Sequence, residues 1–465
     1  LFNSISEIVE YLNHDDRKAL ITTGGNSLAE YTKVRDFQSR LTVRILPADG
    51  AAKRCADLGF HAENVILEKG PFTVQQNVEH LKRSGAEILV TKESGEAGGF
   101  PEKSEAASLC GAQEAINAAD CLIGANRMLE PFSDISKPKL ASWNSAEIRD
   151  YIMSTDFGTY GVLMSGDCGY YSGAQSMLKA LPKDVDAELI SGISSPVYFC
   201  SKLKIPWQDI PTVNLHGENS NIVRNAAMHH RCFFLLGGKC TPRDVCKKLC
   251  DYGMSNIKVY IGKMLGYPEE RIFTGFARDF SDIETSTMSV LITENPTPET
   301  FIRTGISDDE FIRGKVPMTK SEIRSLVVSK LGIVPSDIVW DIGCGTGSVS
   351  VEMALQCYNG TVYSVDLKPE AVELTKQNAL KFHCDNIDIS YGTAPEITEQ
   401  FPTPDKVFIG GSGGNLCEII STVVKRNPNV VLLLTAVALE TLHHAMDAFS
   451  CHSFNVEICQ VSITR

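Results

Sequence analysis

Residues 338–366 read IVWDIGCGTGSVSVEMALQCYNGTVYSVD, and this segment decides the fold of the carboxyl-terminal part of the chain. An apolar run enters three spaced glycines, a helical pattern follows, and a second apolar run ends at Asp366. This order predicts a strand, a glycine turn, a helix and a second strand, the opening of a nucleotide-type α/β sheet. Glycines let the backbone approach a ligand, and an acid at a strand tip can accept hydrogen bonds from ribose hydroxyls. We therefore expect a pocket for an adenosine-bearing cofactor.

The spacing of the glycines indicates which cofactor binds. Dinucleotide sites use G-x-G-x-x-G to seat a pyrophosphate, whereas this loop reads G-x-G-x-G, with Ser348 where the third dinucleotide glycine would fall. The pattern favours S-adenosylmethionine, which carries no phosphate, over NAD. The alternative is a glycine turn that serves packing alone, and the strand context together with the distant acid argues against it.

A second glycine-rich loop, FIGGSGG at 408–414, follows another predicted strand. Ligands of open α/β sheets bind over the carboxyl ends of the strands, so we expect this loop to face the substrate. The alternative is a flexible surface turn.

Five separated motifs carry a resemblance to a known family. They are KVPMTKSEIR at 315–324, WDIGCGTGSVSVE at 340–352, VDLKPEA at 365–371, GTAPE at 392–396 and FIGGSGG at 408–414. From about residue 308 onward, the chain resembles the decarboxylating precorrin-6Y (cobalt-precorrin-6B) C15-methyltransferases of corrin synthesis. The resemblance implies an S-adenosylmethionine site lined by Thr319, Gly343, Cys344, Gly345, Thr346, Gly347, Asp366 and Ala394.

The middle of the chain resembles a second family. Its motifs are SGDCGYYSGA at 165–174, ISGISSPVYFCSKL at 190–203, LHG at 215–217 and ETSTMSVLI at 284–292. These resemble the tetrapyrrole methylases, and among them the C5-methyltransferase half of precorrin-6Y methylases. The resemblance implies two α/β lobes with S-adenosylmethionine between them, held by Gly166, Asp167, Ser194 and Ser195. The chain departs from the family at Cys168, where proline is usual, and it lacks the glycine-rich first strand.

The first segment of the chain resembles a third family. LITTGGNSLAEYTK at 20–33, EKGPF at 68–72 and LVTKESGEAGGFPEKSEAA at 89–107 resemble the carboxyl-terminal half of precorrin-6A reductases. The loop at 91–99 combines hydroxyls, a lysine and glycines, which suits the phosphates of NADPH; an exposed polar loop is the alternative. Because the nucleotide-binding half of the reductase has no counterpart here, we do not expect hydride transfer.

Length and charge set limits on the function. The 465 residues suffice for roughly three domains. A net charge of −13, from 44 basic and 57 acidic residues, opposes nonspecific binding to nucleic acids and anionic membranes. No apolar run is long enough to cross a bilayer. We therefore expect neither a nucleic acid nor a membrane as a partner. The 15 cysteines, none in a C-x-x-C pair, and the lack of a signal peptide predict a cytoplasmic protein without a metal site.

We therefore predict an α/β protein of three units. Residues 1–107 form a partial reductase domain, 108–300 a two-lobed tetrapyrrole methylase without its first strand, and 301–465 a Rossmann-like methyltransferase sheet. Strands and helices alternate through all three, which is typical of βα units around parallel sheets.

The resemblances imply an enzyme that methylates a precorrin or cobalt-precorrin at C5 and C15 and removes the carboxyl group of the C12 acetate, acting as a homo-oligomer. The acceptor carbon is itself electron-rich, so no catalytic base is assigned. Lys315, Lys320 and Arg324 are candidates to contact an acidic substrate, and solvated helix charges are the alternative. Two other functions stay open: a methyltransferase for RNA or protein, and a noncatalytic tetrapyrrole-binding fragment.

Overall fold

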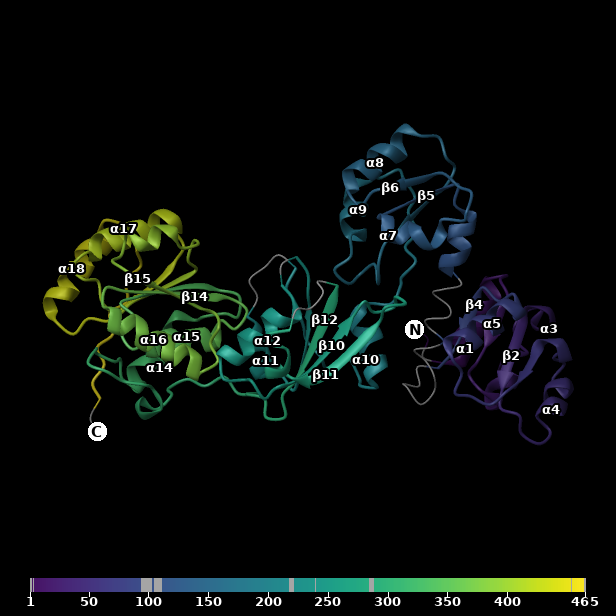
Figure 1. Ribbon diagram of the computed structural model, residues 1–465, viewed down its shortest axis with the longest axis horizontal. Coiled ribbons are helices and arrows are strands. Elements are labelled where there is room, and N and C mark those ends of the chain that lie inside the picture. The colour runs from purple at the N-terminus through teal and green to yellow at the C-terminus, as the bar shows by residue number, and fades with distance from the viewer. Residues whose placement is uncertain are drawn as a thin grey trace. The chain divides into compact units, whose positions relative to one another are not determined.

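The computed structural model describes residues 2–463 except 3, 93–102, 104–110, 217–220, 239, 284–287 and 453. The chain forms two compact units, Leu1–Ile205 and Pro206–Arg465, whose elements are labelled in Figure 1. Each unit contains two sheets with helices packed against them, so the predicted α/β class is confirmed. Within the described residues, no helix has the length and apolar character needed to cross a membrane.

The first unit opens with a four-stranded parallel sheet in the order β3-β2-β1-β4. Its strands are β1 Ala19–Ile21, β2 Leu41–Ile45, β3 Val65–Leu67 and β4 Ile88–Val90. Its helices are α1 Ile5–His14, α2 Leu28–Tyr31, α3 Phe37–Arg40, α4 Ala51–Asp57 and α5 Val74–Ser84. Helix α5 begins with a capping box in which Thr73 and Gln76 exchange hydrogen bonds, an arrangement that stabilises the first turn.

A three-stranded parallel sheet follows in the same unit, in the order β6-β5-β7. Its strands are β5 Cys121–Gly124, β6 Lys139–Ala141 and β7 Tyr160–Leu163. Its helices are α7 Asn126–Leu129, α8 Ser145–Ser154 and α9 Ala174–Ala180, and α10 Ser195–Leu203 follows them in the sequence. The predicted middle segment thus begins as expected, with strands and helices in alternation.

The second unit begins with a mixed sheet in the order β11-β10-β12-β9-β8. Its strands are β8 Thr212–Asn214, β9 Arg231–Leu235, β10 Lys258–Lys263, β11 Arg271–Phe276 and β12 Ser289–Glu294, with helices α11 Ile222–Met228, α12 Pro242–Asp251 and α13 Ala277–Phe280. Only β8 and β9 are parallel, whereas the other pairs are antiparallel. The expected parallel βα alternation is therefore wrong after α12, because a hairpin joins β10 to β11.

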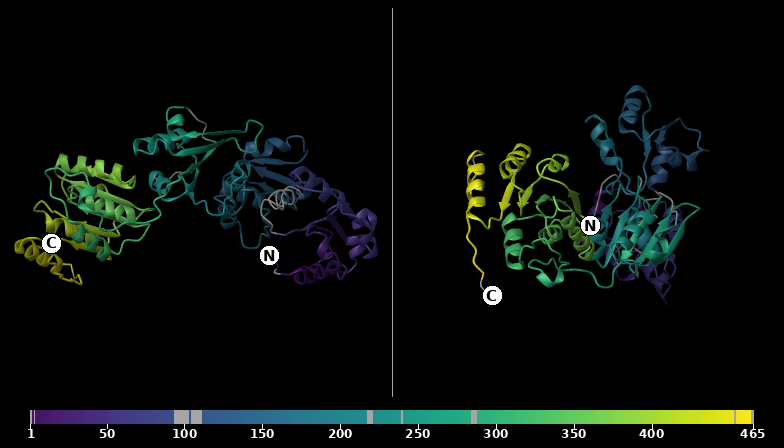
Figure 2. Two further views of the ribbon diagram at one scale, coloured as in Figure 1. Left: turned by 90° about the horizontal axis from the view of Figure 1, so that it is seen from below. Right: turned by 60° about the vertical axis from the view of Figure 1, so that its left-hand side comes forward.

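The carboxyl-terminal sheet is fully parallel, in the order β15-β14-β13-β16-β17. Its strands are β13 Ile338–Ile342, β14 Thr361–Asp366, β15 Ile387–Tyr391, β16 Lys406–Ile409 and β17 Val431–Leu434. Its helices are α14 Ser321–Leu331, α15 Ser348–Gln356, α16 Pro369–Lys381, α17 Leu416–Arg426 and α18 Leu439–Ser450. Figures 1 and 2 show α14, α15 and α16 on one face of this sheet and α17 and α18 on the other, and one apolar core lies beneath each layer.

The strand order creates a switch point between β13 and β16. From β13 the chain runs outward through β14 and β15, then crosses back to add β16 and β17 on the other side. The loops that leave β13 and β16 therefore diverge at the carboxyl edge, where open α/β sheets bind their ligands.

Candidate functional site

A cavity of about 470 Å³ lies at this carboxyl edge. Loops that follow all five strands contribute to it, and residues 316–320, which precede α14, form one wall. The predicted residues that line it are Thr319, Gly343, Cys344, Gly345, Asp366 and Ala394. The loop at 410–413 lines the same cavity, as expected for a loop that faces the ligand side.

The glycine loop after β13 requires glycine for two physical reasons. Gly343, Gly345 and Gly347 have φ values of 80°, 58° and 73°, a left-handed region that other residues rarely adopt. A Cβ at Gly343 would also lie 2.6 Å from the backbone of Gly411, and one at Gly345 would lie 2.8 Å from the carbonyl of Pro317. The glycine loop thus packs closely against the backbone of Gly411 and against that of Pro317, which belong to two other walls of the cavity.

The predicted ribose-binding acid holds the loop closed. One carboxylate oxygen of Asp366 accepts the backbone N–H of Gly345 at 3.0 Å, and the other accepts that of Lys368 at 2.9 Å. Each carboxylate oxygen can accept a further hydrogen bond. Asp366 lines the cavity and is only partly buried, so it remains available to a diol.

Thr346 and Gly347 are not among the residues that line the cavity. The carbonyl of Thr346 accepts the side-chain amide of Asn378 at 2.8 Å, and Gly347 packs against Thr375. Both therefore attach the loop to helix α16.

Asp341, at the end of β13, is a functional candidate that the site prediction missed. Its side chain is fully buried, one oxygen accepts the hydroxyl of Ser350, and the other oxygen, Oδ1, has no partner. Burial, assisted by the like charge of Asp366, raises the pKa of Asp341 to about 7. The available signal was an acid two residues before the first glycine of the loop.

Arg324 does not contact the substrate side, contrary to its proposed role in binding an acidic molecule. Its side chain is 0% exposed and pairs with Asp308 and Glu352. The pattern of α14 explains this, because Arg324 shares the buried face with Val327, Val328 and Leu331. Lys320 does line the cavity, and its Nζ lies 3.5 Å from a carboxylate oxygen of Asp308.

The four residues predicted from the middle motifs lie in the first unit. A Cβ at Gly192 would lie 2.5 Å from the carbonyl of Gly166, and Asp167 accepts the hydroxyl of Ser191 at 3.1 Å. The turn at 165–169 and the loop before α10 are therefore packed together, and Ser194 and Ser195 begin that helix. The motifs at 215–217 and 284–292 belong to the second unit, and residues 217 and 284–287 lie outside the described residues.

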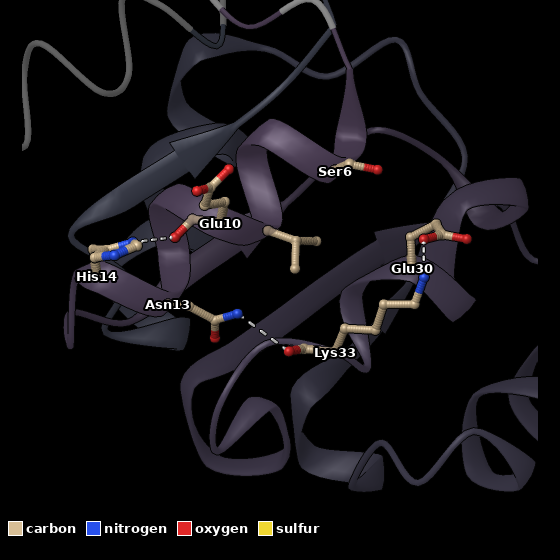
Figure 3. Close-up of a pocket in the computed structure, with 7 residues that line it drawn as sticks. Ser6, Glu10, Asn13, His14, Glu30 and Lys33 are labelled. Carbon is tan, nitrogen blue, oxygen red and sulfur yellow. Dashed lines mark hydrogen bonds and ion pairs between the residues drawn. The ribbon is translucent and has the colours of Figure 1, made fainter.

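A second hollow, of about 420 Å³, opens on the surface of the first unit between α1 and α2. Several of its polar groups bond to each other, as Figure 3 shows: Lys33 pairs with Glu30 at 2.7 Å, and Asn13 donates to the carbonyl of Lys33 at 3.3 Å. We assign it no chemistry. Among the described residues, no cluster of three or more histidine, cysteine or acidic side chains is placed to hold a metal ion. Most of the predicted NADPH loop, residues 93–99, lies outside the described residues.

Comparison with known proteins identifies the family. The model of the precorrin methyltransferase domain matches residues 310–465. A probable cobalt-precorrin-6B C(15)-methyltransferase (decarboxylating) from Pyrobaculum calidifontis is 42% identical over 164 residues, which cover 35% of this chain and 84% of that protein. The Salmonella typhi cobalt-precorrin-6B C(15)-methyltransferase (decarboxylating) is 38% identical over 163 residues, 34% of this chain and 81% of that protein. The chain belongs to this C15-methyltransferase family.

The family match covers the carboxyl-terminal sheet, and other models match the rest of the chain. The precorrin-6x reductase model matches residues 1–117, and that of the tetrapyrrole (corrin/porphyrin) methylases matches 110–281. A solved precorrin-6y C5,15-methyltransferase from Geobacter metallireducens is 39% identical, covering 34% of this chain and 85% of that one, with a TM-score of 0.33. The cavity described above lies within the part that matches the C15-methyltransferases.

Proposed function

We propose that this chain is an S-adenosylmethionine-dependent C-methyltransferase that methylates C15 of a precorrin or cobalt-precorrin and releases the carboxyl group of its C12 acetate as CO₂. The observation that carries the proposal is the cavity between the loops of β13, β14 and β16. It is lined by Asp366, whose carboxylate is only partly buried, and it lies within residues 310–465, which match the family.

The residues of the cavity fit S-adenosylmethionine. Asp366 offers carboxylate oxygens to the ribose hydroxyls. Asp341 does not itself line the cavity, but it directly precedes Ile342, which does. Its buried Oδ1 has no partner, and because a buried carboxylate without a partner is costly, we propose that it faces the ammonium group of the bound cofactor. Thr319 and Ala394 also line the cavity. When bound, the cofactor supplies a methyl group on a positively charged sulfur.

The chain contributes orientation and exclusion of water. Holding two reactants in line lowers the barrier by about 7–11 kcal/mol in favourable cases, and the acceptor carbon of the reduced macrocycle needs no protein base. Breakage of the acetate C–C bond leaves its electron pair in the conjugated macrocycle while CO₂ departs. Lys320, exposed at the wall of the cavity, supplies a positive charge for the carboxylates of the substrate.

Incubation with methyl-labelled S-adenosylmethionine tests the function. With cobalt-precorrin-6B as acceptor, we expect label in the tetrapyrrole and one CO₂ released for each methyl group transferred at C15. Label in added RNA or protein instead would assign the sheet to another substrate. Cofactor binding without any transfer would favour the noncatalytic reading.

We further propose three domains, residues 1–107, 108–300 and 301–465, with a second S-adenosylmethionine site for C5 methylation at Gly166, Asp167, Ser194 and Ser195. The packing of their two loops supports this site. Calorimetry should then give two sites per chain, and in the Asp366→Ala variant one of the two should be weakened while the other keeps its affinity. A stoichiometry of one in the unaltered chain would remove the second site.

For residues 1–107 we propose NADPH as the ligand of the loop at 91–99. Calorimetric titration of the chain with NADPH tests binding. We also propose that the protein is a cytoplasmic homo-oligomer, which sedimentation of the purified chain would test for assembly and fractionation of the source cell for location.

A further inference from the structure

Arg324 lies at the centre of a buried polar network behind the cavity wall. Its Nε donates to Glu352 at 2.9 Å and its Nη1 to Asp308 at 2.8 Å. Nη1 also donates to the carbonyl of Thr319, and Nη2 donates to that of Ile306. All three guanidinium nitrogens are thus bonded in a side chain that is 0% exposed.

The two acids of the network bind the chain on both sides of the arginine. Glu352, on α15 and fully buried, accepts the backbone N–H groups of Gly305 at 2.9 Å and Ile306 at 3.1 Å. Asp308 accepts the N–H of Ser321, the first residue of α14, at 3.0 Å. The network therefore fixes the segment 305–321 at its start and at its end.

This segment forms the wall of the cofactor cavity. Its residues 316–320 line the cavity, and the carbonyl of Pro317 lies 2.8 Å from the position that a Cβ of Gly345 would occupy. The carbonyl of Thr319, one residue before Lys320, is the group that Arg324 holds. The distance between this wall and the glycine loop consequently depends on Arg324.

A buried ion network of this kind is an expensive way to gain stability. Taking charges out of water costs several kcal/mol for each ion, and apolar residues of similar volume often stabilise a fold equally well. Unlike apolar contacts, the hydrogen bonds of a guanidinium are directional, because its planar group holds its partners in fixed positions. Here one of these hydrogen bonds goes to the carbonyl of Thr319, a residue of the cavity wall.

We propose that Arg324 is a positioning residue for the methyltransferase reaction: together with Glu352 and Asp308, it sets the wall at 316–320 against the glycine loop and so determines cofactor affinity. The proposal rests on the proposed function, since the cofactor is S-adenosylmethionine in both. Arg324 touches neither cofactor nor substrate in this arrangement, so its loss acts on binding before it acts on chemistry.

The Arg324→Lys variant of the full chain tests this role. Lysine keeps the charge but loses the planar fork. We expect the KM and the calorimetric Kd for S-adenosylmethionine to rise about tenfold, while kcat at saturating cofactor stays within about threefold. The Glu352→Gln variant keeps one acceptor oxygen, so it retains the bond from Gly305 or the bond from Ile306 but not both, and it should show a smaller rise in the same two constants.

Arg426 supplies a matched control. Its guanidinium also donates to two carbonyls, those of Glu399 and Phe401, and lies 5.6 Å from the ring centroid of Trp340, but it does not line the cavity. Arg426→Lys should lower the Tm without changing cofactor affinity. If Arg324→Lys and Glu352→Gln lower the Tm in the same way and leave Kd unchanged, the role is structural only and the proposal is overturned. Failure of the unaltered chain to bind the cofactor would instead overturn the proposed function, and this inference with it.

Discussion

Asp366 combines two tasks in one carboxylate, and this shapes the effect of its removal. In addition to its expected contact with ribose, it bonds the backbone N–H groups of Gly345 and Lys368. We expect Asp366→Ala to weaken S-adenosylmethionine binding by about 1.5–3 kcal/mol, the range for a lost hydrogen bond to a charged group. Calorimetry on the full chain measures the change.

Asp366→Asn is the control for this prediction, because its amide oxygen still accepts one of the two backbone bonds. It should bind the cofactor more tightly than the alanine variant does. Equal affinity in the unaltered chain and in both variants would show that Asp366 does not contact the cofactor.

The raised pKa of Asp341 leads us to predict that the stability of the chain depends on pH. Burial raises its pKa to about 7 in the folded chain, whereas in the unfolded chain it ionises near its ordinary value. Between these two values the folded state holds a proton that the unfolded state has released. The contribution of Asp341 to stability is therefore largest in acid and declines as the pH rises toward 7. Asp341→Asn carries no such proton, so relative to the unaltered chain its Tm should be higher at pH 8 than at pH 5.

Differential scanning calorimetry without cofactor, at several pH values, measures this difference. Ser350 can still donate to the amide oxygen of the variant, so the comparison isolates the titration. Parallel Tm profiles for the two proteins would contradict the raised pKa.

At the residue scale, the sequence predicts what is local and misses what depends on burial. The glycines and Asp366 were predictable because strand, turn and acid follow each other along the chain. Arg324 was a candidate for the substrate side, with a solvated helix charge as the alternative, and both are wrong because its side chain is 0% exposed. Arg324 lies three residues before Val327 and four before Val328, a spacing that places it on the apolar face of the helix and so indicates burial. The missing partner of Asp341 is a property of packing that no motif reveals.

At the scale of elements, helix α16 ties the glycine loop to the rest of the domain. Asn378 is fully buried, donates to the carbonyls of Thr346 at 2.8 Å and Ile312 at 3.0 Å, and accepts the N–H of Ile312 at 2.8 Å. Asn378→Ala leaves these backbone groups without partners, and each such loss costs about 1–3 kcal/mol. We expect a destabilisation of about 2–4 kcal/mol in urea unfolding followed by the emission of the buried Trp340.

The neighbouring amide, Gln377, provides the comparison. It makes one side-chain hydrogen bond, to Glu373 on the surface of the same helix. Gln377→Ala should cost less than about 1 kcal/mol. A similar loss in both variants would mean that α16, and not the bonds of Asn378 to the loop, limits stability.

The elements of the carboxyl-terminal sheet were predictable because short apolar strands alternate with amphipathic helices there. The same reasoning failed between β10 and β12. Antiparallel strands need only a short turn between them, and the residues 264–270 between β10 and β11 supply it. Apolar alternation does not distinguish a parallel from an antiparallel neighbour, so the mixed sheet was not visible in the sequence.

At the scale of the molecule, the boundaries between the family matches differ from the boundary between the two compact units. The tetrapyrrole methylase match spans 110–281, whereas the two compact units meet between Ile205 and Pro206. No change in composition marks this position, so the sequence gives no sign of it. Contacts far apart along the chain decide which segments form a unit, and such contacts are visible only in three dimensions.

One such contact joins the two sheets of the second unit. The buried side chain of Asp385, in the loop after α16, accepts the N–H groups of Val223 and Arg224 at 3.0 Å each and pairs with Lys248 at 2.9 Å. An acid at the start of a helix is favourable for α11, and Asp385→Ala leaves the N–H groups of Val223 and Arg224 without their carboxylate acceptor. We predict that Asp385→Ala separates the unfolding of the two sheets, so that calorimetry of the full chain shows an additional transition.

Asp388, three residues later and exposed on β15, is the control, and Asp388→Ala should leave the calorimetric profile unchanged. Hydrogen exchange adds an independent measurement: in Asp385→Ala, α11 and α12 should lose protection while the strands β13 and β14 keep theirs. This order follows because α11 loses its carboxylate cap, whereas the parallel sheet retains its own buried core. Unchanged protection of α11 together with an unchanged profile would show that Asp385 does not hold the two sheets as one cooperative unit.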